Sequence, residues 1–298
     1  MIGVASATQE VIQSTSNPRV REYRECVAKG IPGQVALEGV RLVGDALAAG
    51  LRLSAVYVTD TALADGDIRS IVETARRAGS SVYLVSDRVG HSMGATVNPQ
   101  GLFALAGWSP RTGREVLEQV ERHTQRASFV VLLDGLQDPG NVGTIVRTAA
   151  ALGAEAVIAG AGSADPANPK VVRASMGAVF RIPVAREASL PRLMAWAAGR
   201  GWTAFATHVD PAGSTRVDEL RWPPSAGVAD TSSSASGEPP RALVVIGSEA
   251  HGVSSECLRQ CAGAVHVPMA RQVESLNAAT AAAIVMYELS RNAGGFRG

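Results

Sequence analysis

The segment 129–153, FVVLLDGLQDPGNVGTIVRTAAALG, decides the fold of the longer part of this chain. It begins with a continuous apolar run, residues 129–134, which is typical of a strand buried on both faces. A polar loop follows, and apolar residues then recur at helical spacing as far as Gly153, a residue type that commonly ends helices. The segment therefore predicts a strand, a loop and a helix, which is the repeating unit of a parallel sheet.

Further strands of this type follow along the chain. They are expected at AVIAG 156–160, FRIPV 180–184, WTAFATH 202–208, ALVVIG 242–247 and AVHVPM 264–269. Helical patterns separate them, and a last helix over 275–291 closes the unit. This alternation predicts an α/β domain whose parallel sheet is covered by helices on both faces. The Ser-, Ala-, Gly- and Pro-rich stretch 223–240 interrupts the pattern, and we interpret it as a mobile insertion.

A smaller α/β pattern precedes this domain. Strand-like and helix-like runs alternate over residues 34–107, and a polar, charge-rich stretch follows them. We therefore predict a first domain over 1–108 with an N-terminal extension, a linker with an exposed helix over 109–128, and the second domain over 129–298.

The charge balance excludes several classes of protein. The 298 residues carry 28 basic and 27 acidic side chains, a net charge of +1, and 46% of them are hydrophobic. A globally basic nucleic-acid coat, an acidic solvating protein and a disordered chain are excluded. Only Lys29 and Lys170 are lysines. This bias fits either GC-rich coding or a need for bidentate recognition of phosphate by arginine.

Cysteine usage and hydropathy indicate the compartment. Three cysteines, Cys26, Cys257 and Cys261, form no disulfide framework, and no His/Cys/carboxylate cluster has the spacing of a metal site. The N-terminus lacks the features of a secretory leader, and no apolar run is long enough to span a bilayer. We expect a cytoplasmic protein that binds neither metal nor membrane.

Common nucleotide and hydrolase motifs are missing from the sequence. No G-x-G-x-x-G follows the first strand of either domain, and the chain contains no P-loop and no G-x-S-x-G motif. Dinucleotide-dependent oxidoreductases, P-loop enzymes and nucleophile-elbow hydrolases are therefore unsupported.

Candidate chemistry lies in three loops that follow strands of the second domain, where ligands bind in open parallel sheets. The loops are 138–147 (DPGNVGTIVR), 247–253 (GSEAHGV) and 267–277, which begins VPM and ends ESLN. The first holds Asn141 and Arg147, and the second holds Glu249. Each polar residue also has a structural interpretation: Asn141 as a helix cap, Arg147 as a surface arginine, and Glu249 as a carboxylate at a helix start.

These three loops, in this order, resemble the signature motifs of the SpoU/TrmH RNA 2′-O-ribose methyltransferases of the SPOUT class. The matching patterns are N-x-G-x-I-x-R-T-A from Asn141, I-G-S-E-x-x-G from Ile246, and V-P-M with E-S-L-N-A-A-T-A from Val267 to Ala281. SNPRV, LEGVRLVGDAL and NPQGLFAL, earlier in the chain, are similar to the family's ribosomal-protein-like substrate-binding domain. The resemblance covers nearly the whole chain apart from the insertion.

The resemblance implies a specific fold and activity. It implies a C-terminal SPOUT domain with a deep trefoil knot, a homodimer, and S-adenosyl-L-methionine as cofactor. The methyl group would pass to a ribose 2′-hydroxyl of RNA, with rRNA as the leading substrate, 23S rRNA in particular. A tRNA substrate, and a non-catalytic RNA-binding or ribosome-assembly protein of the same fold, stay open as alternatives. A role in antibiotic resistance, as in relatives that protect a producer's rRNA, also stays open.

Site residues follow from the resemblance, motif by motif. The catalytic candidates are Arg147, Asn141, Glu249, Ser275 and Asn277. The cofactor candidates are Thr207, His208, Gly247, Val267, Met269, Ser275, Leu276 and Asn277. RNA contact would come from local arginines, Arg19, Arg21 and Arg24 near the start and Arg147 with Arg173 near the site, along a strip free of acidic residues.

Overall fold

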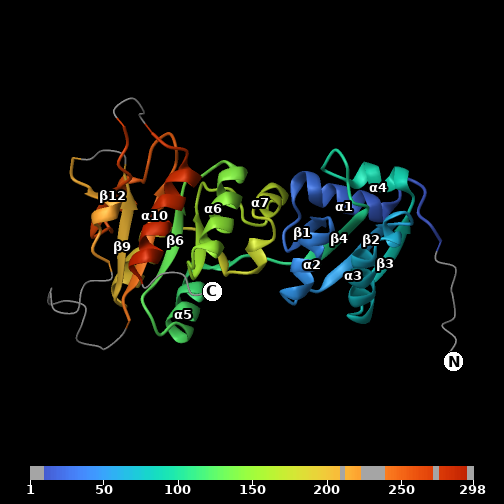
Figure 1. Cartoon of the computed structure of the whole chain (residues 1–298), viewed down its shortest axis with the longest axis horizontal. Coiled ribbons are helices and arrows are strands. Elements are labelled where there is room, and N and C mark those ends of the chain that lie inside the picture. Colours follow the sequence, from blue (N-terminus) through green and yellow to red (C-terminus); the bar gives the residue numbers. More distant parts are fainter. Residues whose placement is uncertain (1–9, 209–211, 223–238, 271–274, 294–298) are drawn as a thin grey trace. The chain divides into compact units, whose positions relative to one another are not determined.

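The computed structural model describes residues 10–208, 212–222, 239–270 and 275–293. The chain separates into two compact units (Figure 1). The main boundary lies between Ser109 and Pro110, and the short segment Ala167–Pro169 is grouped with the first unit. Most of the predicted insertion, residues 223–238, lies outside the described residues.

The first unit is built on a small mixed sheet. Its strands are β1 (Gln34–Glu38), β2 (Leu53–Thr59), β3 (Ser81–Val85) and β4 (Leu102–Gly107), in the order β1-β4-β2-β3. Its helices are α1 (Pro18–Lys29), α2 (Val40–Ala48), α3 (Gly66–Arg77) and α4 (Asp87–Met93), with a 3₁₀ turn at Ala62–Ala64. Strand β4 is antiparallel to both of its neighbours, whereas β2 and β3 are parallel.

An aromatic cluster forms the core between this sheet and helices α1 and α4. The rings of Tyr23, Tyr57 and Phe103 are buried, and Tyr23 meets the other two edge to face at centroid distances of 5.8 and 5.6 Å. Helix α1 starts sharply because Asn17 accepts a hydrogen bond from the backbone N–H of Arg19 and Pro18 occupies the first turn.

The second unit contains a larger, wholly parallel sheet. Its strands are β5 (Arg111–Thr112), β6 (Ser128–Asp134), β7 (Ala156–Gly160), β8 (Val184–Glu187), β9 (Trp202–Thr207), β10 (Thr215–Arg216), β11 (Arg241–Gly247) and β12 (Gly263–His266). Their order is β10-β12-β9-β11-β6-β7-β8-β5, and every recorded pairing is parallel. The predicted α/β parallel-sheet fold is therefore confirmed, while the trefoil knot stays a prediction.

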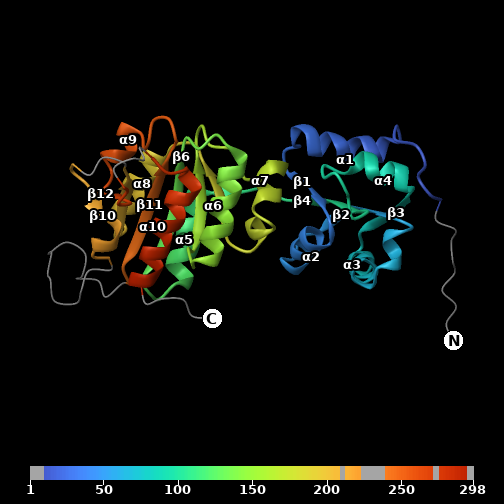
Figure 2. The ribbon, with the colours of Figure 1, turned by 45° about the horizontal axis from the view of Figure 1, so that its top comes forward.

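Helices cover both faces of this sheet. They are α5 (Gly113–His123), α6 (Pro139–Ala151), α7 (Pro169–Ala174), α8 (Leu190–Ala198), α9 (Ser255–Leu258) and α10 (Ala278–Asn292), with 3₁₀ turns at Ala178–Phe180 and Val217–Glu219. Helices α6 and α10 pack side by side on one face (Figures 1 and 2). Helices α5, α8 and α9 bury their apolar side chains against the sheet in a separate core cluster.

Helix α5 differs from the exposed linker helix that the sequence suggested. Val116, Leu117 and Val120 are almost completely buried and belong to the core cluster of the second unit. The polar composition of segment 109–128 hid this face, because its apolar residues are few but fall on one side of the helix. A capping box between Thr112 and Glu115 fixes the start of the helix.

Strand β8 starts later than predicted. The sequence favoured residues 180–184, but a 3₁₀ turn at Ala178–Phe180 continues the preceding helical segment, and pairing begins at Val184. Pro183 lies just before the strand, where its missing N–H costs no ladder bond and its carbonyl accepts from Val157 N at 3.1 Å.

Helix α1 carries a mixture of charges instead of the expected strip of arginines. Exposed Glu22 and Glu25 lie between and beside the exposed arginines 19, 21 and 24. The guanidinium of Arg19 lies over the ring of Tyr83, 4.1 Å from its centroid, and Nε of Arg21 donates to the carbonyl of Ser16. The idea of an acid-free path is therefore wrong for this helix.

Candidate active site

The carboxyl ends of three neighbouring parallel strands border a cavity in the second unit. Strand β9 ends at Thr207, β11 at Gly247 and β12 at His266, and the strands lie in the order β12-β9-β11. The cavity has a volume of about 430 Å³. Its position agrees with the predicted ligand site of an open parallel sheet.

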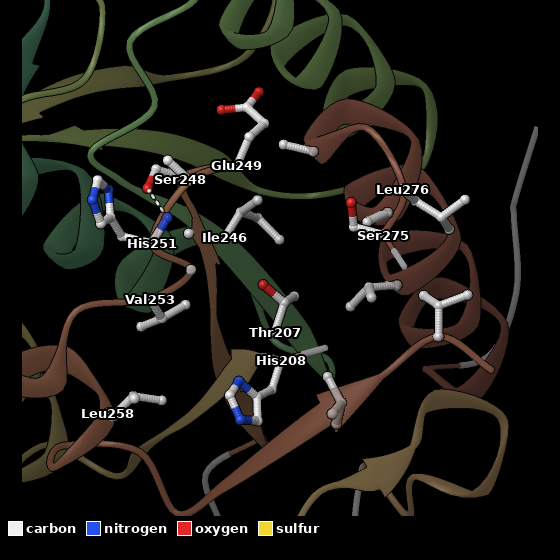
Figure 3. A pocket seen from close by; sticks show the side chains of 18 of the residues that line it. Thr207, His208, Ile246, Ser248, Glu249, His251, Val253, Leu258, Ser275 and Leu276 are labelled. Atoms are coloured by element: carbon white, nitrogen blue, oxygen red, sulfur yellow. Dashed lines mark hydrogen bonds between the residues drawn. The ribbon is translucent and has the colours of Figure 1, made fainter. Parts of the chain in front are cut away.

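Most of the predicted cofactor residues line this cavity. They are Thr207, His208, Gly247, Val267, Met269, Ser275 and Leu276. Figure 3 shows Thr207, His208 and Ser275 around the cavity, with Glu249 at the edge of the group and its carboxylate directed outward. Asn277 is not part of the lining; instead it caps α10, and its Oδ1 accepts from the backbone N–H groups of Ala279 and Thr280.

Several lining residues were missed by sequence reasoning. They are apolar residues of strands, helices and loops, and include Ile246, Val253, Leu258, Val265, Ala278, Ala281 and Val285. In the sequence these residues are indistinguishable from core positions, since the same periodic pattern serves both. A cavity with apolar walls and a few polar groups, like this one, is typical of small-molecule sites.

The second loop folds back tightly on the end of β11. Ser248 and Gly252 form a two-way backbone bridge, with N···O distances of 3.0 and 2.9 Å. A Cβ atom at Gly247 would overlap the Gly252 carbonyl group and Val253 N, so this approach requires glycine. Oδ2 of Asp134, at the end of β6, accepts from Ser254 N at 2.8 Å and ties the far side of the loop to the sheet.

This geometry corrects the structural interpretation of Glu249. Helix α9 begins after Ser254, whose side chain caps it, so Glu249 lies within the loop and not at a helix start. Its exposed carboxylate accepts a hydrogen bond from Nδ2 of Asn141. A capping role therefore does not account for the residue.

Asn141 joins all three loops. Its Nδ2 donates to Glu249, and its Oδ1 accepts from Nδ2 of Asn277 at 3.0 Å. The capping role considered for Asn141 is wrong, because Asp138 is the N-cap of α6 and accepts from Asn141 N at 2.8 Å. Its side chain therefore links Asn277 to Glu249 in a hydrogen-bonded series, and Glu249 lines the cavity.

Arg147 lies apart from this hydrogen-bonded chain. It is exposed on α6 and does not line the cavity, and its Nη1 donates to the sulfur of Met176 at 2.9 Å. The structure thus brings Asn141, Glu249 and Asn277 together by direct hydrogen bonds and leaves Arg147 on the neighbouring surface.

The thiols of Cys257 and Cys261 are poor nucleophiles. Burial raises the pKa of Cys257 to about 11 and that of Cys261 to about 12, so both are protonated at neutral pH. Within the described residues, no group of three or more His, Cys, Asp or Glu side chains could hold a metal ion. No helix in the same part of the chain is long and apolar enough to cross a membrane.

Comparison with known proteins identifies the family. Residues 128–287 match the model of the SpoU rRNA methylase family, and residues 36–107 match that of the RNA 2′-O ribose methyltransferase substrate-binding domain. The unit with the parallel sheet and the cavity at its carboxyl edge therefore corresponds to the methylase domain of an RNA methyltransferase. The chain belongs to the SpoU rRNA methylase family, as the three loops suggested.

Relatives match the chain over almost its whole length. A tRNA/rRNA methyltransferase of Synechocystis, itself uncharacterised, is 34% identical over 94% of this chain and 93% of its own length. The 23S rRNA (guanosine(2553)-2′-O)-methyltransferase RlmP of Bacillus subtilis is 29% identical over 93% and 98%. An AdoMet-bound rRNA methyltransferase from Sinorhizobium meliloti has the same fold, with a TM-score of 0.78, 28% identity, and coverage of 95% of this chain and 97% of that one.

Proposed function

We propose that this protein transfers a methyl group from S-adenosyl-L-methionine to a ribose 2′-hydroxyl of 23S rRNA. The observation that carries the proposal is the cavity at the carboxyl ends of β9, β11 and β12, whose lining includes Glu249, the last member of the hydrogen-bonded series Asn277–Asn141–Glu249. The name of the Bacillus subtilis relative supports the substrate, and the AdoMet-bound Sinorhizobium meliloti structure supports the cofactor.

The cavity fits this cofactor in size and chemistry. Its volume of about 430 Å³ lies within the roughly 300–1,000 Å³ usual for small-molecule and cofactor sites. Ile246, Val267 and Leu276 offer apolar walls, and Thr207, His208 and Ser275 offer polar atoms. When bound, S-adenosylmethionine supplies an activated methyl group on a sulfonium, so the protein has chiefly to align the ribose oxygen with it.

The hydrogen-bonded chain would position RNA beside this cavity. Asn277 and Asn141 fix one carboxylate oxygen of Glu249 through successive amide donors. Among the described residues no donor is bonded to the second oxygen of Glu249, which can therefore accept a hydrogen bond from a ribose or base. A held carboxylate of this kind orients a donor without having to reorganise during the reaction.

Arg147 would act on the RNA side of the reaction. A guanidinium rarely loses its proton, so the residue is better suited to bind a phosphate or to stabilise the developing negative charge on the 2′-oxygen than to act as a base. Its exposure on α6 supports contact with a large substrate.

Arg147→Ala should reduce methyl transfer by at least 100-fold, while calorimetry should show cofactor affinity within about twofold of wild type. Retained transfer would remove Arg147 from the mechanism.

A homodimer is part of the proposal. Arg147 on α6 and Tyr287 on α10, which is 46% exposed, both lie on the helix pair that covers one face of the sheet. A second copy of the protein packed against α6 and α10 would place part of its surface beside Arg147. Light scattering after gel filtration should give twice the 30.8 kDa chain mass. A monomer that is fully active would contradict the dimer.

Mapping ribose methylation on total RNA, with and without the protein, separates the remaining substrates. A lost mark on 23S rRNA supports the proposal, and a lost mark on tRNA supports the alternative substrate. Intact marks everywhere, with no cofactor binding by calorimetry, would instead fit a non-catalytic RNA-binding protein. Growth with ribosome-targeting antibiotics in the same pair of strains tests the resistance role. The proposed site of action is the cytoplasm, where the RNA substrates are.

A further inference from the structure

Met176 has an unusual backbone conformation beside the proposed site. Its φ of 49° makes it the one non-glycine residue with positive φ in the described part of the chain, and Gly177 follows with a φ of 81°. The left-handed region is unfavourable for a long side chain that cannot hydrogen-bond to its own backbone. Such strain persists where the surrounding structure enforces it, and it often marks a functional position.

The packing around α6 explains how this conformation is enforced. A Cβ atom at Gly143 would lie 2.5 Å from Cβ of Ala174, 2.6 Å from the Val171 carbonyl and 2.9 Å from Ser175 N. Glycine therefore lets the end of α7 approach α6 very closely. The completely buried Ser175 donates to the Val172 carbonyl at 2.8 Å and fixes the turn.

This close approach brings Met176 to Arg147. Arg147 follows Gly143 by four residues, one turn along the same face of α6. The sulfur of Met176 lies 2.9 Å from Nη1 of Arg147, although the methionine is 37% exposed. Within the described residues no carboxylate forms an ion pair with Arg147.

We propose that Met176 is a positioning residue that orients Arg147 toward the RNA without neutralising its charge. The inference rests on the role proposed above for Arg147. A carboxylate in this position would orient the guanidinium more strongly, but it would compete with the RNA phosphate or the developing oxyanion. A thioether is a weak, uncharged acceptor, so it can direct one N–H group and leave the positive charge available.

The contact can be tested without any activity measurement. The protein contains six methionines, and selective ¹³C labelling of their methyl groups gives one signal for each. In Arg147→Lys the Met176 signal should shift, while the signal of Met194, buried in the core of the second unit, should stay. An unchanged Met176 signal would overturn the inference.

Kinetics then test the function of the contact. With protein-free 23S rRNA that lacks the modification, Met176→Leu should lower kcat/KM for RNA roughly tenfold, because it removes a hydrogen bond to a charged group while keeping the side-chain size. The matched control Met194→Leu should leave kcat/KM unchanged. Cofactor affinity should stay within about twofold in both variants.

A double variant shows whether Met176 acts through Arg147. Met176→Leu should have no further effect when it is added to Arg147→Lys, whereas independent, multiplying losses would overturn the inference. Full activity of Met176→Leu, with activity lost in Arg147→Lys, would overturn the role of Met176 alone. Full activity of Arg147→Lys would instead overturn the proposed role of Arg147, and with it the need for positioning.

Discussion

At the scale of single residues, the side chain of Asn141 holds the three candidate loops together, because it donates to Glu249 and accepts from Asn277. Parallel strands end at a common edge, so loops 138–147, 247–253 and 267–277 were expected to be close. The hydrogen bonds themselves join residues far apart in the chain, since Asn141 is 108 residues from Glu249 and 136 from Asn277. Only tertiary packing makes Asn141 the link between them and gives the capping role to Asp138.

Gly247 supplies the first prediction at this scale. Gly247→Ala should weaken cofactor binding at least tenfold, because the new Cβ would overlap the Gly252 carbonyl group and displace the loop. Isothermal calorimetry with S-adenosylmethionine measures the change. Gly263→Ala, in β12, is the matched control: its Cβ would meet nothing within 4 Å, and binding should be unaffected. Equal affinity in the two variants would mean that the loop can relax around the methyl group.

At the scale of helices and strands, periodic patterns gave correct predictions wherever an element is apolar throughout. Strands β6, β7 and β11 lie where their continuous apolar runs placed them. Elements with few apolar residues were misjudged: α5 was expected to be exposed, and α4, capped by Ser86, was not predicted at all. In α5 the burial depends on a partner surface, on α8 and β8, that the local sequence does not specify.

Glu121, near the end of α5, supplies the prediction at this scale. Burial raises its pKa, but hydrogen bonds from Arg200 and Trp202 lower it by more, so the net pKa lies below its usual range. The carboxylate therefore contributes stability above the ordinary carboxyl pKa of about 4.3, and this contribution is lost as the pH falls through the lowered value.

We expect Glu121→Gln to reduce the free energy of unfolding by about 1–2 kcal/mol at pH 7. Below pH 4 the difference from wild type should shrink, since the wild-type carboxylate is then increasingly protonated. Urea unfolding at several pH values measures both quantities. Glu118→Gln, on the same helix, is the control. A pH-independent difference would show that the loss comes from packing and not from the charge.

At the scale of the whole molecule, the chain forms two units, each with its own core cluster. The expectation of two α/β domains came from the alternation of strand and helix patterns. The start of the second domain was harder to predict from the sequence, because two elements of this domain, β5 and α5, precede its first long apolar strand. Strand β5 pairs with β8, and α5 contributes Val116, Leu117 and Val120 to the core of the second unit.

Truncation tests this organisation. A chain that starts at Pro110 should fold and bind S-adenosylmethionine with near-wild-type affinity, because it retains the complete core cluster and the cavity. A chain that starts at Phe129 should lose several kcal/mol of stability, at roughly 1.5–3 kcal/mol for each large apolar side chain removed from the core. Thermal unfolding and calorimetry compare the two. Equal stability would contradict the structural role of α5.

Asn277 has two roles at the start of α10. Its Oδ1 caps the helix, and its Nδ2 donates to Asn141. Ser, Thr, Asp and Asn all cap helices well, but of these only Asn also carries an amide donor, so replacement by Asp would keep the cap and lose the link. The set of residues tolerated by folding is therefore wider than the set tolerated by the site. Replacement of Asn277 by another capping residue would therefore preserve the fold and remove the hydrogen bond to Asn141 at the site.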